Sequence, residues 1–488
     1  MNRLRIAYVS SELSPFAKVG GLGDVAAALP TALHELGHDV RPFLPLYGVI
    51  DTHLDFSPVV GLAEIPVSFG NNVYSFSVFT SPQPGTGLNV YFIHCPALYG
   101  RPHIYTRDED EHIRFLLLSR AVLEICQRMG WSPDVIQCND WQTALVPLFL
   151  KTHYAWDRLF ENTHTVLTIH NLGYQGVYPS DILPHFRFEG GRELFDKEDL
   201  QSGQINFLKT GIRYADRLTT VSPTYAKEIQ TETYGMGLHG LLRERSADLV
   251  GILNGVDYGE WNPKTDRLIP YRYSEKSLWR KTRNKRALLN QYGLGYAREI
   301  PLVGMVSRLA AQKGLDLLPP SLPAVLAGRD VRMIVLGSGE SKYEEFLHGL
   351  QAAFPDKVRF HNGFSNELAH LVEAASDAFL MPSKYEPCGL NQMYSLKYGT
   401  VPVVRKTGGL ADTVTPFDPG TGEGTGIVFE HYTPEGVRWG LETALDLFKD
   451  IDVWRKIMAN GMAQDFSWGS QARRYAGVYE ELANAVRS

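Results

Sequence analysis

Lys18, Arg308, Lys313 and Glu386 are the side chains whose types and neighbours point most directly to chemistry. Lys18 lies in "KVGGLGDV", the other two cations lie in "SRLAAQKG", and Glu386 lies in "YEPCGL". Arg308 and Lys313 share one short loop after an apolar run. Two cations placed in this way form a clamp for a diphosphate, because both donate charge-assisted hydrogen bonds to phosphate oxygens. The alternative for this loop is a solvated surface turn.

Glu386 stands shortly before a glycine and a predicted helix. The first N–H groups of that helix, which follow Cys388 and Gly389, are suited to hold phosphate. An acid beside an anion site needs a reason, and the hydroxyl groups of a sugar supply one, since a carboxylate accepts hydrogen bonds from them. The alternative is that Glu386 merely caps the helix.

The turn that carries Lys18 is rich in glycine. Gly20, Gly21 and Gly23 follow the apolar run Leu4 to Val9 and precede residues with helical spacing, so they lie in a strand-to-helix turn. At the carboxyl edge of a doubly wound sheet, such glycines let a ligand approach the backbone. A tight turn without a ligand is the other interpretation, and the spacing is not that of the dinucleotide-binding GxGxxG. This stretch alone does not decide between the two.

Polar side chains also follow two later strands. "QCNDWQ" places Asn139 and Asp140 at a strand end, where Asp140 is either an N-cap or a functional carboxylate. "TIHNLGYQG" places His170, Asn171 and Tyr174 after the next strand, where they can hydrogen-bond a polyol, although a single histidine is more often structural. A second Gly-Gly-Leu turn follows in "RKTGGLADTV".

The elements that must position these residues form two arrays of alternating strands and helices. The first array has strands in "LRIAYVS", "DVRPFLP", "DVIQC", "TVLTIH", "DRLTTVS" and "LVGILNG", with helices such as 140–153 and 205–215. After the connector "NGVDYGEWNPKTD" the second has strands in "IPLVGMVSR", "DVRMIVLGSG", "KVRFHNG", "DAFLMPS" and "TVPVV", with a helix over 314–327. Alternation of this kind indicates mostly parallel sheets.

The pattern therefore predicts an α/β protein with two Rossmann-like domains, 1–255 and 256–488, that face a central cleft. Segments 431–463 and 467–486 are predicted as terminal helices that pack back on the first domain. The length of 488 residues agrees with two domains, each with its own core.

Composition excludes several classes of partner. The net charge of −6 argues against nucleic acid or an anionic membrane, and no apolar run reaches membrane-spanning length.

The four cysteines, Cys95, Cys126, Cys138 and Cys388, show no CxxC pairing, which argues against a zinc site or a disulfide framework. With a strand almost at the N-terminus and no room for a signal peptide, we expect a cytoplasmic protein.

"KVGGLGDV", "TIHNLGYQG", "ILNGVD", "SRLAAQKG", "YEPCGLNQMYSLKYG" and "TGGLADTV", in this order over nearly the whole chain, resemble the bacterial glycogen synthases and plant starch synthases that use ADP-glucose. The resemblance implies a glycosyltransferase-B enzyme that transfers glucose to the non-reducing end of an α-1,4-glucan with retention of configuration. It implies neither a metal nor another cofactor. The implied partners are ADP-glucose, ADP and glycogen or maltooligosaccharide; the oligomeric state is left open.

The resemblance also assigns roles to residues. It implies that Glu386, His170, Lys18 and Asp140 act in catalysis, and that Tyr99, Asn171 and Tyr174 are acceptor or peripheral residues. The implied donor-binding residues are Lys18, Gly20, Gly21, Asp24, Asn254, Arg308, Lys313, Cys388, Gly389, Leu390, Asn391, Gly408 and Gly409.

The chain departs from the family pattern at several positions. Asn139 and Gln142 replace the two histidines of "HDWH", His239 stands where a glutamate is expected, and Asn391 replaces a threonine. Other retaining glycosyltransferases carry a second glutamate eight positions after the first, where this chain has Tyr394. No departure removes a donor-binding cation or Glu386.

No enzymic nucleophile is evident, so we favour a same-face mechanism in which the leaving phosphate helps to deprotonate the incoming hydroxyl. Two alternatives to a synthase remain. A glucan phosphorylase would need a pyridoxal-phosphate lysine and a longer chain. A non-catalytic glucan-binding protein could use the 24 Tyr, 23 Phe and 8 Trp, but it has no use for a diphosphate clamp. The residues do not fix the base of the nucleotide donor.

Overall fold

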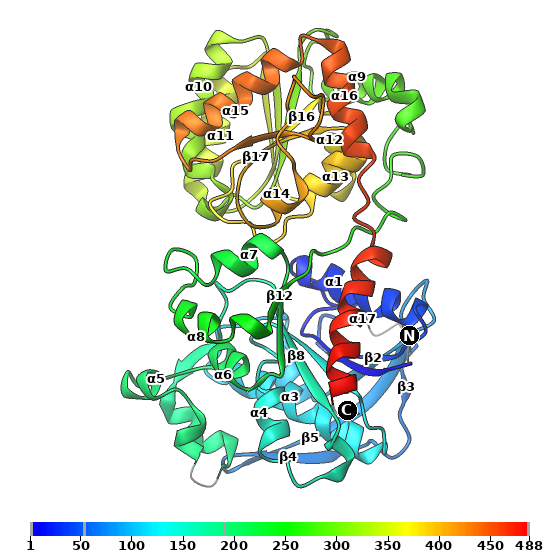
Figure 1. Cartoon of the computed structure of the whole chain (residues 1–488), viewed down its shortest axis with the longest axis vertical. Coiled ribbons are helices and arrows are strands. Elements are labelled where there is room, and N and C mark those ends of the chain that lie inside the picture. Colours follow the sequence, from blue (N-terminus) through cyan, green and yellow to red (C-terminus); the bar gives the residue numbers. More distant parts are fainter. Residues whose placement is uncertain (1–2, 52–54, 189–190, 486–488) are drawn as a thin grey trace. The chain divides into compact units, whose positions relative to one another are not determined.

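The computed structural model describes residues 3–51, 55–188 and 191–485 (Figure 1). The chain divides into two compact units. Unit 1 comprises Met1–Val221, Ala226–Gly255 and Trp468–Ser488, and unit 2 comprises Ser222–Tyr225 and Val256–Ser467. Each unit contains a largely or wholly parallel sheet with helices, so the predicted α/β class is confirmed. No helix among the described residues combines the length and the apolar character needed to cross a membrane.

Unit 1 contains a ten-stranded sheet in the order β12-β11-β8-β7-β1-β2-β6-β5-β3, with β4 paired to β5. Pairing is parallel from β12 to β6 and antiparallel beyond β6. Its strands are β1 (Arg5–Val9), β2 (Asp39–Pro45), β3 (Ser57–Pro58), β4 (Ile65–Phe69), β5 (Asn72–Pro82), β6 (Asn89–His94), β7 (Val135–Asn139), β8 (His164–Ile169), β11 (Arg217–Thr220) and β12 (Leu249–Gly251). A separate ribbon joins β9 (Val177–Pro179) to β10 (Gln204–Asn206).

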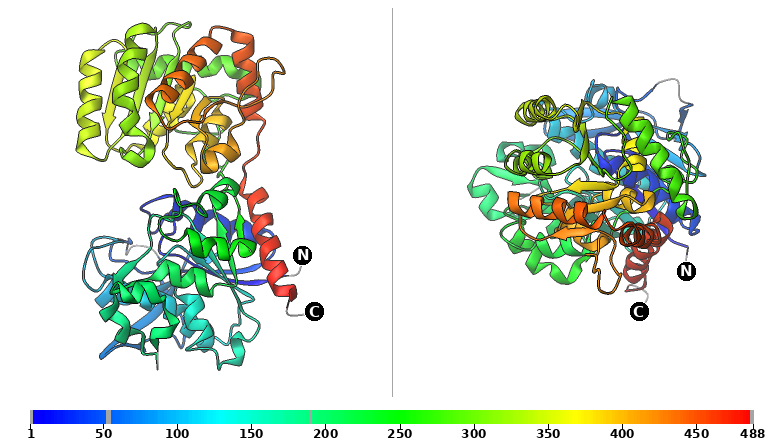
Figure 2. Two further views of the ribbon diagram at one scale, coloured as in Figure 1. Left: turned by 60° about the vertical axis from the view of Figure 1, so that its left-hand side comes forward. Right: turned by 90° about the horizontal axis from the view of Figure 1, so that it is seen from above.

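The helices of unit 1 are α1 (Gly21–Glu35), α2 (Pro96–Tyr99), α3 (Glu111–Arg128), α4 (Val146–Lys151), α5 (Lys197–Gln201), α6 (Phe207–Tyr214), α8 (His239–Glu244) and α17 (Trp468–Ala485). The short helix α7 (Pro223–Glu228) contains the division between Tyr225 and Ala226. Helix α17, red in Figures 1 and 2, packs against α1, and its Tyr479 hydroxyl donates to Gln137 Oε1 at 2.8 Å.

Unit 2 contains a six-stranded parallel sheet in the order β15-β14-β13-β16-β17-β18. Its strands are β13 (Leu302–Val306), β14 (Arg332–Gly337), β15 (Val358–Asn362), β16 (Ala378–Met381), β17 (Val401–Arg405) and β18 (Ile427–Phe429). Its helices are α9 (Lys281–Gln291), α10 (Leu318–Gly328), α11 (Ser341–Ala353), α12 (Asn366–Ala375), α13 (Asn391–Tyr398), α14 (Gly408–Thr413), α15 (Pro434–Leu447) and α16 (Ile451–Met462).

The unit 2 sheet is apolar on both faces, as expected for parallel strands covered by helices on each side. Val303 and Met305 of β13 join a core with residues of α10, α11 and α15. Leu302, beside Val303 in the strand, joins the opposite core with residues of α9 and α12. Figure 2 shows these helices around the sheet. Successive side chains of a strand point to opposite faces of the sheet, so each strand contributes residues to both cores.

Several predicted helix boundaries were wrong. The helix predicted over 140–153 covers only Val146–Lys151, because Asp140 has a left-handed φ of 54° and residues 141–145 form turns. The helix predicted over 205–215 begins at Phe207, after the β10 strand, where the Asn206 side chain caps it. The helix predicted over 314–327 begins at Leu318, because Gly314 has a φ of 76° and a separate 3-10 turn precedes the helix.

The terminal helices also differ from the prediction. Segment 431–463 forms two helices, α15 and α16, which break where the Asp450 side chain caps α16. Both belong to unit 2, so only α17 packs in the first unit and the expectation for all terminal helices was wrong. Residue 486 of the predicted last helix lies outside the described residues.

The strand order of each sheet reverses beside its first strand, and this places the candidate site residues. In unit 2, β13 lies between β14 and β16, and in unit 1, β1 lies between β7 and β2. Ligands of open α/β sheets bind at the carboxyl ends of strands where the order reverses. The predicted diphosphate loop follows β13, Glu386 follows β16, the glycine turn follows β1 and Asp140 follows β7.

Candidate active site

A cavity of about 190 Å³ lies where the strand order of unit 2 reverses. It lies between the carboxyl ends of β13 and β16 and the start of α13. Its walls are Met305, Val306, Ser307, Arg308, Lys313, Leu380, Met381, Ser383, Glu386, Gly389, Leu390 and Asn391. Six of these, from Arg308 to Asn391, were predicted as site residues from the sequence, and the fold brings them around one space.

Lys313 and Glu386 form an ion pair inside this cavity. Lys313 Nζ donates to Glu386 Oε2 at 2.7 Å, and the Ser383 hydroxyl donates to the same oxygen at 3.0 Å. The carboxylate side chain is only 6% exposed, and the lysine side chain is 20% exposed. Glu386 therefore does not cap α13, whose N-cap is Leu390. The carboxylate is held at the cavity wall by two donors.

Arg308 and the backbone before α13 supply further hydrogen-bond donors. The Arg308 side chain is exposed and makes no hydrogen bond or ion pair with the described residues. Nor does any described residue accept a hydrogen bond from the amides of Gly389, Leu390 or Asn391. The Asn391 side chain donates to Val306 O at 2.7 Å and so ties the start of α13 to the end of β13. The cavity thus presents a cation and three amides suited to an anion.

Gly408 and Gly409 brace the backbone beside Glu386. Gly409 N donates to the carbonyl oxygens of Glu386 and Pro387 at 3.0 and 3.2 Å. A Cβ atom on Gly408 would lie 2.0 Å from Glu386 O, and one on Gly409 would lie 1.9 Å from Cys388 O. Close backbone packing thus explains both glycines, and the buried Cys388 belongs to the backbone that they support. Their contact with the donor stays a prediction.

In unit 1, a carboxylate that the sequence analysis did not single out holds the glycine turn. Glu12 Oε2 accepts hydrogen bonds from Val19 N and Gly20 N at 2.7 and 2.9 Å. These two amides are therefore satisfied internally. A Cβ atom on Gly20 or Gly21 would meet nothing within 4 Å, so packing does not require glycine there. The open space over both residues leaves the backbone accessible to a ligand.

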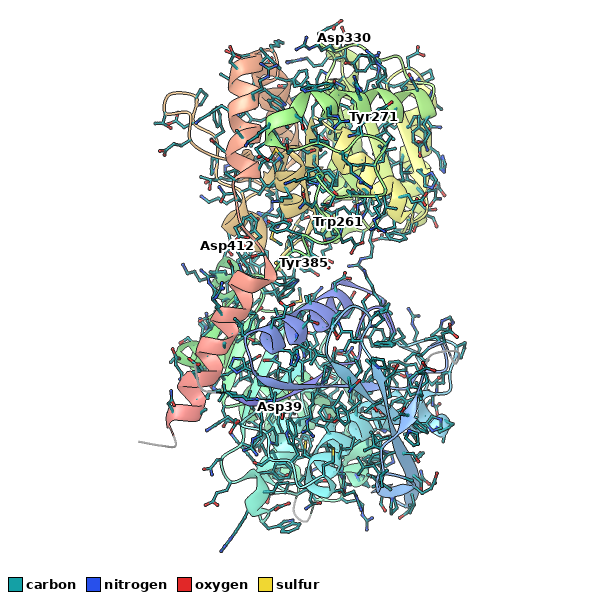
Figure 3. The ribbon with its side chains drawn as sticks, turned by 90° about the vertical axis from the view of Figure 1, so that its right-hand side faces the viewer. Asp39, Trp261, Tyr271, Asp330, Tyr385 and Asp412 are labelled. Carbon is teal, nitrogen blue, oxygen red and sulfur yellow. The ribbon has the colours of Figure 1, made fainter. Side chains whose placement is uncertain are left out.

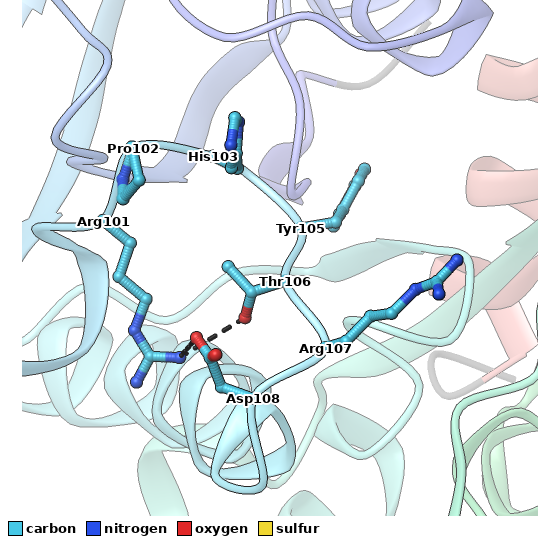
Figure 4. Close-up of a pocket in the computed structure, with 7 residues that line it drawn as sticks. All are labelled: Arg101, Pro102, His103, Tyr105, Thr106, Arg107 and Asp108. Carbon is cyan, nitrogen blue, oxygen red and sulfur yellow. Dashed lines mark hydrogen bonds and ion pairs between the residues drawn. The ribbon is translucent and has the colours of Figure 1, made fainter.

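Two further contacts surround this turn. Lys18 Nζ donates to Asp24 Oδ1 at 2.7 Å, and both side chains are substantially exposed. The Tyr105 hydroxyl donates to Glu12 Oε1 at 2.7 Å. Tyr105 also lines a cavity of about 570 Å³ formed by the loop from Arg101 to Asp108 (Figure 4). The hydroxyl of Tyr105 thus links this loop to the glycine turn.

Asn139, Asp140 and His170 meet at the ends of β7 and β8. Asp140 Oδ1 accepts from the backbone of His170 at 2.7 Å, so the carboxylate fastens the next loop and is not the N-cap of a helix. Burial raises the pKa of Asp140 to about 7. His170 Nε2 lies 2.9 Å from Asn139 Oδ1. Burial lowers the pKa of His170 to about 3, so the imidazole is neutral at physiological pH.

The other predicted residues of unit 1 have different environments. Asn254 is buried, and its Oδ1 has no hydrogen-bond partner among the described residues, which suits an atom that accepts from a ligand. Asn171 Oδ1 accepts from Gly173 N at 3.0 Å, and Tyr174 is 55% exposed. Tyr99 was predicted as an acceptor or peripheral residue. It is fully buried and its hydroxyl donates to Arg114 O at 2.7 Å, so it belongs to the core.

Tyr394, at the position of the missing second glutamate, belongs to an aromatic stack. Its ring lies parallel to that of Trp261, with centroids 3.9 Å apart, and Trp261 stacks in turn on His370 at 3.7 Å. Trp261, labelled in Figure 3, comes from the connector that begins unit 2. Trp261 of the connector is thus packed against Tyr394 of α13 and His370 of α12.

The contacts that the sequence analysis missed join residues far apart in the chain. Glu12 contacts Tyr105 at a separation of 93 residues, and Asn139 contacts His170 at a separation of 31. The position of Glu12 after the first strand was a signal that could have singled it out. Within the described ranges, no group of three or more His, Cys, Asp or Glu side chains is arranged to hold a metal ion.

Comparisons with known proteins identify the family of the chain. Residues 5–244 match the family model of the starch synthase catalytic domain, and residues 295–456 match that of the group 1 glycosyl transferases. A glycogen synthase of Koribacter versatilis is 46% identical, with 99% of each chain covered, and one of Anaeromyxobacter dehalogenans is 44% identical, with 98% and 99% covered.

Among solved structures, the catalytic domain of starch synthase IV from Arabidopsis thaliana, bound to ADP and acarbose, superposes with a TM-score of 0.90. It is 35% identical, with 99% of this chain and 100% of that chain covered. The chain therefore belongs to the glycogen and starch synthase family of glycosyltransferases, with two Rossmann-like domains of the glycosyltransferase-B type.

Proposed function

We propose that this enzyme transfers glucose from ADP-glucose to the non-reducing end of an α-1,4-glucan with retention of configuration, and so elongates glycogen. The observation that carries the proposal is the unit 2 cavity. There the Lys313–Glu386 ion pair lies beside the unpaired Arg308 and the unpaired amides of 389–391. Such a cavity offers positive charge to a diphosphate and a carboxylate to sugar hydroxyls.

Breaking the bond between glucose and phosphate develops negative charge on the leaving diphosphate and positive charge on the sugar. Arg308, Lys313 and the amides of 389–391 stabilise the first charge, because they are fixed before the reaction begins. Glu386 accepts hydrogen bonds from glucose hydroxyls and stabilises the second. A phosphate oxygen of the leaving group accepts the proton of the incoming glucan hydroxyl on the same face, so configuration is retained.

Residues of unit 1 take the remaining roles in this proposal. Lys18, beside Gly20 and Gly21, binds the donor, and the unpaired Asn254 Oδ1 accepts from a glucose hydroxyl. His170 contacts the transferred glucose, and Asp140 holds the His170 backbone in place. Asn171 and the exposed Tyr174 are the remaining candidates for acceptor contact. The four free, buried cysteines suit a reducing compartment and support a cytoplasmic location.

Incorporation of labelled glucose into glycogen tests the proposed function. The purified enzyme should transfer glucose from ADP-glucose, and much more slowly from UDP-glucose. Digestion of the product with an exo-acting α-1,4-glucosidase should release the label, because the new residue is terminal. Absence of transfer from either donor would overturn the proposal, whereas preference for UDP-glucose would correct only the donor base.

Activity should survive exhaustive chelation. Arg308 and Lys313 supply the positive charge that a divalent ion gives the diphosphate in many other transferases. We expect the rate in excess EDTA to stay within about twofold of the untreated rate, far from the large loss that follows removal of a catalytic charge. Loss of activity in EDTA, restored by magnesium or manganese, would contradict this prediction.

Replacing Lys18 by Ala should weaken the use of ADP-glucose much more than glycogen binding. The Lys18–Asp24 pair is exposed, so its loss should leave the melting temperature nearly unchanged. We expect kcat/KM for the donor to fall by roughly tenfold to 100-fold, with Lys18→Arg partly restoring it. Donor kinetics and a glycogen sedimentation assay measure the two effects. Equal weakening of both would place Lys18 elsewhere than at the donor.

A further inference from the structure

The imidazole of His170 is held by a residue that is unusual for its position. His170 Nε2 lies 2.9 Å from Asn139 Oδ1, where the family pattern has a histidine in place of Asn139. Asn139 is 1% exposed. No described residue makes a hydrogen bond with His170 Nδ1. One ring nitrogen of His170 is therefore engaged and the other is available.

The Asn139 side chain is anchored so that only its oxygen can face His170. Asn139 Nδ2 donates to Val9 O at 2.8 Å, and a carbonyl oxygen can only accept, so this contact fixes which amide atom is nitrogen. The Tyr8 hydroxyl donates to Asn139 Oδ1 at 3.3 Å. Asn139 N donates to Thr143 Oγ1 at 2.5 Å. These contacts tie Asn139 to β1 and to the turn after β7.

An amide oxygen cannot donate, so the contact requires a proton on His170 Nε2. In a neutral imidazole Nδ1 is then unprotonated and acts as a hydrogen-bond acceptor. A histidine at position 139 would not impose this choice, because a neutral imidazole can present either N–H or a bare nitrogen. The replacement thus specifies one tautomer.

We propose that Asn139 is a positioning residue that holds His170 as the Nε2–H tautomer, so that Nδ1 accepts a hydrogen bond from a hydroxyl of the transferred glucose. The second half of this inference rests on the proposed function, and the first half does not. Asn139 acts through His170 and does not itself contact substrate.

The surroundings keep the imidazole neutral. Burial of His170 disfavours its charged form, in agreement with the lowered pKa. The titratable groups linked to it are Asp140, Tyr8 and Glu12. Asp140 accepts from the His170 backbone, and the charge of Glu12 adds to the raised pKa of Asp140. Burial raises the pKa of Tyr8 well above its usual value, so Tyr8 stays a neutral donor to Asn139.

Nitrogen NMR of the full chain, labelled with ¹⁵N-histidine, tests the tautomer without substrate. A His170→Asn sample identifies the His170 signals among those of the 15 histidines. We expect a protonated Nε2, a bare Nδ1 and no titration between about pH 5 and pH 8, although a free histidine titrates there. A proton on Nδ1, or an ordinary titration of His170, would overturn the proposal.

Asn139→Asp tests the positioning role with almost unchanged shape, at the loss of the hydrogen bond from Nδ2 to Val9 O. A carboxylate beside Nε2 favours the imidazolium, so His170 should titrate within the accessible range and lose its Nδ1 acceptor when protonated. We expect kcat at pH 6 to fall about tenfold or more relative to the wild type, with the donor KM nearly unchanged and partial recovery at pH 8. If the ratio of kcat at pH 6 to kcat at pH 8 is the same in Asn139→Asp as in the wild type, the positioning role is refuted.

Gln142→His is the matched control, because Gln142 is the other position where the family histidine is replaced and its Oε1 has no described partner. This change should leave the His170 tautomer as in the wild type. If Asn139→Asp does not fold, NMR of Asn139→His tests whether Asn139 selects the tautomer. In Asn139→His we expect both tautomers of His170 to be detected. A single Nε2–H tautomer in folded Asn139→His would also overturn the proposal. Failure of glucose transfer itself would leave the NMR result intact.

Discussion

Replacing Glu386 by Gln should lower kcat by about 10²-fold or more, while the donor KM changes much less. The substitution keeps the shape of the side chain and an oxygen that still accepts from Lys313 and Ser383. It removes only the negative charge, which stabilises the positive charge of the sugar more in the transition state than in the ground state. The cations and amides that hold the diphosphate remain, so donor affinity should persist.

Steady-state kinetics and a melting curve of the same Glu386→Gln preparation test this result. Glu430→Gln is a suitable control, because Glu430 forms a similar ion pair with Lys406 at 2.9 Å but is exposed. The control should match the wild type in both kcat and melting temperature. Near-normal kcat with a lowered melting temperature for Glu386→Gln would show that this carboxylate serves stability alone.

Replacing Lys313 by Ala should be still more damaging, with kcat/KM reduced by roughly 10³-fold and a lowered melting temperature. The change removes a cation from the diphosphate and leaves the nearly buried Glu386 carboxylate without its ionic partner. Arg308→Ala is the informative comparison, because Arg308 is exposed and unpaired within the described chain. It should impair donor use without lowering the melting temperature.

The double variant Lys313→Ala/Glu386→Gln separates the two effects of Lys313. Neutralising the carboxylate should restore part of the lost stability, because no unpaired charge is then buried. Activity should stay at or below that of Lys313→Ala. Full activity of Lys313→Ala, or a melting temperature equal to that of the wild type, would contradict this account of the ion pair.

The strands could be predicted because buried parallel strands are short, nearly continuous apolar runs bounded by polar residues. All eleven predicted strands are present, from β1 to β17. Strands β3 to β5 were not predicted, because their residues are partly exposed and polar residues interrupt the apolar ones. The apolar run in β6 was overlooked, and the three-residue strands β9, β10 and β18 are too short to give a pattern. Helix starts were misplaced where one backbone angle decides, as at Asp140 and Gly314.

In the candidate site, too, local features could be predicted and long-range contacts could not. A diphosphate-binding role for Arg308 and Lys313 could be predicted from their residue types and from their position after one strand. The ion pair of Lys313 with Glu386 joins residues 73 positions apart, and no local pattern reports such a contact. Glu12 was not singled out, and the contact of Asn139 with His170 was not predicted, for the same reason: both depend on residues that only tertiary folding brings together. The burial of Tyr99 could not be predicted, because residue type alone does not reveal whether a tyrosine is buried.

The stack of Tyr394 on Trp261 also bears on how this lineage can change its chemistry. A mutation to glutamate at position 394 would insert an acid at a position only 9% exposed, against an indole that is already held by His370. The carboxylate would lose most of its hydration, and the connector would lose an aromatic neighbour. A chain with this single change would therefore be less stable than the present one. The effect of glutamate at position 394 thus depends on other residues. The two-glutamate arrangement requires compensating changes in the connector first.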